Sequence, residues 1–213
     1  MTIPENFDGK NEHDLLIGSY NSIENKNYLE IITSDIEKKA LAETFLNTFQ
    51  IDLFNSDFSI QNLFKLTKSN GHFYIAQCLF DFGLSFGGGK YDRFLKHRYH
   101  YDLFGFGVAK VELGETLLRE KTIGDKLVGH FLHSSIQIKD CDSFNEKFYL
   151  VSDKKENIIK FFDKDFANTV NKYNGLCIRT KANKIYLTFE NHLEQMQSRI
   201  VEDIFSAFKY WVD

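Results

Sequence analysis

The residues best suited to chemistry lie together in one short stretch, "FGGGKYDRFLKHRYHYD", residues 86–102. Glycines followed by a lysine are typical of loops whose backbone amides surround a phosphate. A Walker A loop also needs Ser or Thr directly after the lysine to bind Mg²⁺, and Tyr91 follows Lys90 here. We therefore interpret the stretch as a loop between two strands. The alternative is an anion-binding loop with these contacts: Gly87, Gly88, Gly89, Lys90, Arg93 and His97.

Two histidine pairs raise the question of a metal site: His97 with His100, and His130 with His133. On a helix, a spacing of three places both imidazoles on one face, where a carboxylate such as Asp102 could complete the site. Neither pair contains the glutamate of the H-E-x-x-H pattern, and in a strand residues three apart point to opposite faces. The sequence therefore predicts no metal site and no cofactor.

Cations and aromatic rings occur together in the same stretch, a combination that single-stranded nucleic-acid binding uses. The net charge of the whole chain, however, is −4, and its pI is about 6.0. Contacts with phosphates dominate nucleic-acid affinity, so an acidic chain favours other partners. We do not expect nucleic acid to be the partner.

Cysteine usage and the first residues bear on the compartment. Cys78, Cys141 and Cys177 lie far apart and form no C-x-x-C pair, and such a sparse, odd set is typical of a reducing compartment. The start, "MTIPENFDGKNEHD", lacks the basic residues and apolar run of a signal peptide. No apolar run reaches the roughly 18 residues of a membrane span. We expect a soluble, cytoplasmic protein with no membrane span.

The elements that must position these residues are predicted to form an α+β fold. The 213 residues include 22 Phe and 10 Tyr, enough rings for a large core. Residues 1–33 are expected to form an N-terminal arm and the first elements, where "LLIGSY" and "NYLEII" fit either helix or strand. Residues 34–213 are expected to form a single α+β domain, because neither a repeat nor a proline linker divides them.

Helix signals are clearest at the two ends of this domain. Ser34 and Glu37 form a capping box. The apolar face predicted for the helix that follows consists of Ile36, Ala40, Leu41, Phe45 and Phe49. The last helix, about 191–211, has the stronger amphipathic pattern. Its apolar stripe consists of Leu193, Met196, Ile200, Val201, Ile204, Phe205 and Phe208.

The middle of the chain predicts further helices. In 153–175, Asp153 and Asp163 are each placed to cap a helix, and Gly175 is a plausible stop for the second. A short helix is also predicted within 114–135. Its expected apolar face is Ile123, Leu127, Val128, Phe131 and Leu132.

Strands are predicted around two hairpin turns, "SNG" near residue 70 and "KAN" near residue 182. The first turn joins strands at about 60–68 and 71–83, and a third strand follows at 102–113. Two more strands are expected at 135–140 and 144–152, and the second turn lies within a hairpin at 176–190. Together, the predicted helices and strands indicate a mainly antiparallel sheet with an N-terminal helix, two middle helical segments and a long C-terminal amphipathic helix packed on it.

The core spacing of three segments is distinctive: "SIQNLFKLTKSNGHFYIAQCLFDFG", "DSFNEKFYLVSDKKENIIKFFDKDF" and "GLCIRTKANKIYLTFE". These segments resemble a bacterial family of domains of unknown function, many of whose members are anchored to membranes. They are similar to its paired strands, its F-N-x-x-F strand followed by a helix, and its closing hairpin. The resemblance covers about 53–190 and implies a variable insert at 86–102, but no activity. The chain departs from the family in lacking a membrane span.

The function that follows is that of an uncharacterised, non-enzymatic protein-interaction domain, with a protein partner or a homodimer. Aromatic residues at the end of the last helix are common interface anchors, and they define a candidate partner surface: Phe208, Tyr210 and Trp211. The alternative is an enzyme or binder of a phosphate-bearing or other anionic ligand that uses residues 86–102.

Overall fold

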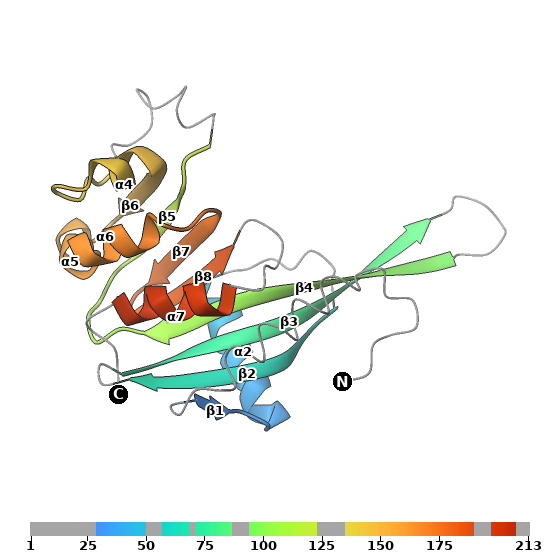
Figure 1. Cartoon of the computed structure of the whole chain (residues 1–213). Coiled ribbons are helices and arrows are strands. Elements are labelled where there is room, and N and C mark those ends of the chain that lie inside the picture. Colours follow the sequence, from blue (N-terminus) through green and yellow to red (C-terminus); the bar gives the residue numbers. More distant parts are fainter. Residues whose placement is uncertain are drawn as a thin grey trace.

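A computed structural model of the chain describes residues 29–49, 57–68, 71–86, 94–122, 135–189 and 197–207 (Figure 1). In these residues the fold is α+β, as predicted: an antiparallel sheet of eight strands with helices on both faces. The order of the strands across the sheet is β1-β2-β3-β4-β8-β7-β5-β6.

The N-terminal half of the sheet is a meander of neighbouring strands. The turn predicted at "SNG" is confirmed, because Lys68 pairs with Gly71 across it. The end of "NYLEII" forms a strand, and Leu29 pairs with Leu66. The strands of this half are β1 (Leu29–Ile31), β2 (Asp57–Lys68), β3 (Gly71–Phe86) and β4 (Phe94–Val108).

The C-terminal half joins the meander through a short contact between β4 and β8, which runs from the Gly105–Leu187 pair to the Val108–Lys184 pair. The hairpin predicted around "KAN" is confirmed, with Ala182 at a φ of 53° in its turn. The strands of this half are β5 (Thr116–Glu120), β6 (Phe148–Ser152), β7 (Leu176–Lys181) and β8 (Lys184–Phe189).

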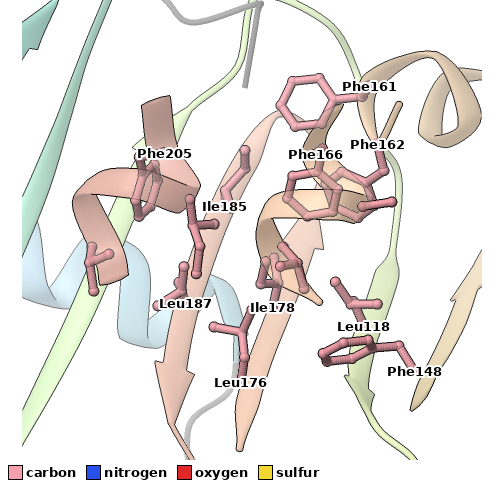
Figure 2. Close-up of a cluster of buried hydrophobic side chains, with 14 of the residues drawn as sticks. Leu118, Phe148, Phe161, Phe162, Phe166, Leu176, Ile178, Ile185, Leu187 and Phe205 are labelled. Carbon is pink, nitrogen blue, oxygen red and sulfur yellow. The ribbon is translucent and has the colours of Figure 1, made fainter. Parts of the chain in front are cut away.

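Strand alternation divides the buried side chains between two cores. On one face, Leu63, Phe104 and Tyr186 form a core together with Leu41 of α2 (Asp35–Phe49). The larger core, on the other face, contains side chains from every strand of the C-terminal half (Figure 2). The helices on that face are α4 (Asp142–Lys147), α5 (Lys155–Phe161), α6 (Lys164–Val170) and α7 (Gln197–Ala207).

Helix α7 crosses the sheet where β4 has a glycine. The ring of Phe205 stacks on Phe73 with centroids 4.6 Å apart, and a Cβ at Gly105 would lie 2.5 Å from that ring and 3.0 Å from Val201. The glycine therefore gives the helix room to approach. Val201, Ile204 and Phe205 are buried, which confirms the central part of the predicted stripe; its two ends lie outside the described residues.

The predicted loop at 86–102 is corrected. Strand β4 begins at Phe94 instead of 102, so only 87–93 lie between β3 and β4. The polar and basic residues after 93 led to the loop prediction, but they form a strand. This strand is set by pairing with β3, which starts at the Phe86–Phe94 pair. The strand also ends at Val108 instead of 113, where the Ala109 amide donates to the carbonyl of Asn183.

Residues 114–152 differ most from the prediction. Residues 116–120 form strand β5, which was not predicted. The apolar face of the helix predicted within 114–135 lies at 123–132, outside the described residues. Residues 135–138 form no strand, and α4 occupies the first half of the strand predicted at 144–152. The reason is a side chain: Asn145 bonds to the amide and the carbonyl of Ile138 (2.9 and 2.8 Å), in place of a strand partner.

Two of the three predicted helix-end residues act differently. Asp163 caps α6 as predicted, accepting from the amide of Phe166 at 3.0 Å. Asp153 does not cap α5, because its carboxylate accepts from the amide of Glu115 at 2.7 Å. Gly175 has a φ of 67°, but α6 ends at Val170, so this glycine lies too far along to be its stop.

The first predicted helix forms, but its apolar face is only partly right. The Ser34 hydroxyl accepts from the amide of Glu37 at 3.4 Å, as the capping box predicts. Ile36 is 84% exposed and Ala40 is also exposed, because the helix meets the core further along, at Leu41. The side chains of residues 45–49 lie outside the described part.

Candidate functional site

Strands β3 and β4 continue past the end of β2 as a two-stranded arm, which we define as residues 82–86 and 94–98. β2 reaches only to the Asp57–Asp81 pair. Within the described ranges, the pairs from Phe82–Arg98 to Phe86–Phe94 adjoin no third strand, and Figure 1 shows them projecting from the sheet. The arm therefore adds reach to the molecule.

The register of the arm places cationic residues opposite apolar ones. Arg98 pairs with Phe82, and Lys96 pairs with Leu84. The described residues 82–86 and 94–100 contain no carboxylate. The basic residues around residue 96 were evident in the sequence. The strand that sets their positions was not predicted there.

The predicted site residues fall largely outside the described residues. This applies to the glycines, Lys90 and Arg93 of the anion-binding alternative, to the candidate partner surface, and to the second histidine pair. The first histidine pair lies in β4, where His97 pairs with Gly83 and His100 with Phe80. These positions have opposite parity along the strand. The described residues contain no group of three side chains that could hold a metal ion.

Hydrogen bonds of Lys147 and Tyr173 hold the helix layer together. The Lys147 ammonium donates to the carbonyls of Asn171 and Tyr173 (3.1 and 2.7 Å) just after α6, where a cation complements the C-terminal end of a helix. The Tyr173 hydroxyl donates to Asp203 of α7 at 2.7 Å. Burial and this hydrogen bond raise the pKa of Tyr173 to about 12. These groups are engaged in tertiary contacts.

The environment of Cys141 disfavours its thiolate. None of the three cysteines forms a disulfide, and Cys78 and Cys141 are buried. Burial raises the pKa of the Cys141 thiol above its usual value, chiefly by desolvation. A nucleophilic cysteine needs the opposite shift, so Cys141 suits a packing role.

A surface that the sequence analysis missed lies on β5, β6 and β7, on the sheet face opposite α4–α6. Cross-strand pairing arranges its six positions in two rows of three. All six side chains keep part of their surface exposed. We call this surface the β5–β7 patch; its rows are Val151–Leu117–Arg179 and Tyr149–Arg119–Cys177.

The β5–β7 patch combines guanidinium groups with apolar side chains. The Arg119 guanidinium lies over the Tyr149 ring, 5.3 Å from its centroid, and also donates to the carbonyl of Glu120 at 3.1 Å. Arg179 is exposed. The alternation in 148–152 and 176–181 could have indicated this face, but the central strand β5 was not predicted.

No protein-family model, curated protein or solved structure matches the chain. The helices of the described residues include none that is long and apolar enough to cross a membrane.

Proposed function

We propose that the chain is a non-enzymatic protein-interaction domain. The two-stranded arm carries this proposal. A hairpin with no third strand is marginally stable in water. Extending a hairpin beyond the sheet therefore adds little to the free energy of unfolding. Such an extension suits an element that packs against a partner protein.

The chemistry of the described residues supports the proposal. Lys147 and Tyr173 are used in tertiary hydrogen bonds, and burial raises the pKa of Cys141, which disfavours its thiolate. The resemblance to the bacterial family of unknown function remains a prediction, and it implies no activity. We also propose a cytoplasmic location, on the cysteine usage noted above.

The test removes the arm and keeps the sheet. In the arm-shortened variant, an Asn-Gly turn replaces residues 82–98, directly after Asp81 and before Tyr99, which pair with each other in the full chain. Both proteins are used to capture partners from host lysate. Each candidate is then produced in pure form, and its Kd is measured by calorimetry.

We expect the shortened variant to retain the cooperative unfolding of the full chain and to bind a verified partner at least tenfold more weakly. Equal Kd values for every verified partner would refute the role of the arm. If purified partners bind neither protein, the interaction function itself is wrong.

The register of the arm favours one alternative, a binder of anionic ligands. Lys96 and Arg98 share a face of β4, with no carboxylate among the described arm residues. Binding of a nucleotide or polyphosphate to the native chain would raise its unfolding midpoint. A rise that disappears in the Lys96→Glu/Arg98→Glu variant would support this alternative over a protein partner.

A further inference from the structure

We propose that the turn between α6 and β7 is a site of self-modification, in which the amide nitrogen of Gly175 attacks the side chain of Asn174 to form a cyclic imide. Glu120 is the base for this step, and Lys147 polarises the carbonyl under attack. Water then opens the imide to aspartate or isoaspartate. The inference goes beyond the proposed interaction function, and it uses neither the arm nor the β5–β7 patch.

The residue pair itself is suited to this chemistry. In an Asn-Gly pair the main-chain nitrogen of glycine reaches the amide carbon of asparagine with no side chain in its way. The pair lies in the short connection between Val170, where α6 ends, and Leu176, where β7 begins. Asn174 is exposed, and Gly175 has a φ of 67°, which glycine adopts without strain. The turn therefore places both reacting groups outside regular structure.

A carboxylate faces the nitrogen that must attack. The Gly175 amide donates to Oε2 of Glu120 at 2.8 Å. A main-chain amide is a poor nucleophile until its proton leaves, and a carboxylate within hydrogen-bond reach can accept that proton as the new bond forms. Glu120 is the last residue of β5, and the pairing of Arg119 with Cys177 keeps this strand end beside the turn.

A cation faces the carbonyl that is attacked. The Lys147 ammonium donates to Oδ1 of Asn174 at 2.7 Å. Negative charge collects on this oxygen in the tetrahedral intermediate, and a donor already aimed at it stabilises that charge. The ammonium is also held by the carbonyls of Asn171 and Tyr173. It is therefore oriented before the reaction begins.

The atoms balance with water as the only co-reactant. Attack forms the bond from the Gly175 nitrogen to Cγ of Asn174, and the intermediate collapses by breaking the bond from Cγ to Nδ2. The proton that Glu120 accepted leaves with Nδ2 as ammonia, which restores the carboxylate. Water then adds to the imide: opening at the side-chain carbonyl gives aspartate, and opening at the main-chain carbonyl gives isoaspartate.

The product differs from asparagine in charge and in backbone length. Aspartate places a carboxylate against the Lys147 ammonium. Isoaspartate lengthens the main chain by a methylene group directly before Leu176, which is fully buried and pairs with Phe189. The modification therefore alters the junction between the helix layer and the sheet.

A purely structural role for the same two contacts predicts the opposite effect on the rate. Contacts that only fix the turn would hold the two reacting groups in place, so the native chain would convert more slowly than the unfolded chain. A base and a polarising cation make the native chain convert faster. The effect of folding on the rate at Asn174 therefore separates the two roles, and Asn70–Gly71 provides a second Asn-Gly pair as an internal reference.

The experiment follows both Asn-Gly pairs by timed peptide mass spectrometry, starting from freshly purified full chain in neutral buffer or in guanidinium chloride. Conversion is read from the mass gained when the amide becomes an acid, and isoaspartate is detected with a methyltransferase specific for it. Three proteins are compared: the wild type, Glu120→Gln, and the control Glu156→Gln. Glutamine keeps an acceptor for the Gly175 amide but removes the base, and Glu156 is an exposed glutamate of α5.

We expect Asn174 of the native wild type to convert at least tenfold faster than the same residue in guanidinium chloride, with isoaspartate among the products. Glu120→Gln should slow this native conversion at least fivefold and leave the rate at Asn70 unchanged. Glu156→Gln should change neither rate, and the three proteins should convert equally when unfolded. Cooperative unfolding of both variants is verified in the same denaturant.

Three results would overturn the inference. A native wild type that converts Asn174 no faster than the unfolded chain would do so without any variant, even if Glu120→Gln fails to fold. An unchanged native rate in a folded Glu120→Gln variant would exclude Glu120 as the base. Aspartate without any isoaspartate would exclude the cyclic imide. None of these results affects the capture test of the arm.

Discussion

Replacing Gly105 with Ala should lower stability, although alanine is normally the better residue in a strand. The new methyl carbon would lie 2.5 Å from Cε2 of Phe205 and 3.0 Å from Cγ1 of Val201. Phe205 is fully buried and stacks on Phe73 with an interplanar angle of 7°. The ring therefore cannot move aside without losing this contact.

The magnitude follows from two opposing effects. Overpacking a core costs about 1–3 kcal/mol, and removing a glycine from a strand returns roughly 0.5–1 kcal/mol of backbone entropy. We expect the free energy of unfolding to fall by about 1–2 kcal/mol. Urea denaturation, followed by fluorescence, measures this change.

A double-mutant cycle tests the reasoning. Phe205→Leu removes the ring that the methyl group meets and is destabilising by itself, because it empties part of the core. In the Gly105→Ala/Phe205→Leu variant, the loss should be smaller than the sum of the two single losses by about 1 kcal/mol. A neutral Gly105→Ala substitution, or strict additivity, would show that α7 does not approach β4 at this glycine.

Three further predictions use local contacts. Asp163→Ala removes the acceptor of the Phe166 amide and should reduce the free energy of unfolding by about 1 kcal/mol in urea; an unchanged midpoint would contradict the cap. Because the pKa of Tyr173 is raised from 10.0 to about 12, its contribution is complete below pH 10 and is lost as pH rises toward 12. The stability difference between wild type and Tyr173→Phe should therefore be constant from pH 8 to 9.5 and shrink above pH 10, and parallel curves in denaturant titrations would disprove this. Cys177 is partly exposed, whereas Cys141 is buried with a raised pKa, so iodoacetamide should modify Cys177 first in timed mass spectra, and the reverse order would count against the packing described.

Local signals predicted the parts of the fold that depend on neighbours in sequence. The Asp163 cap and the buried stripe of α7 were both recognised, because capping and helical periodicity involve residues three or four positions apart. The two hairpins were recognised from their turn residues. Strand β5 was missed because its position is set by pairing with β6 and β7, which are distant in sequence.

The candidate surfaces also combine features visible in the local sequence with features set only by strand pairing. The basic, aromatic character of the arm was visible in the sequence, but its strand register was not. The β5–β7 patch escaped notice because its six residues come from three separate strands. Asn145 likewise gave no local sign that it would hold residues 135–138 in place of a strand.

The sequence by itself determined the α+β class, the hairpin turns, the Asp163 cap and the apolar stripe of the last helix, because each depends on short-range geometry and side-chain type. Only the tertiary structure decided which strands become neighbours, and therefore that Arg119 and Arg179 share a face with Leu117 and Val151. The physical reason is that strand pairing links residues with no local relation. The chemistry of a sheet surface is thus a property of register.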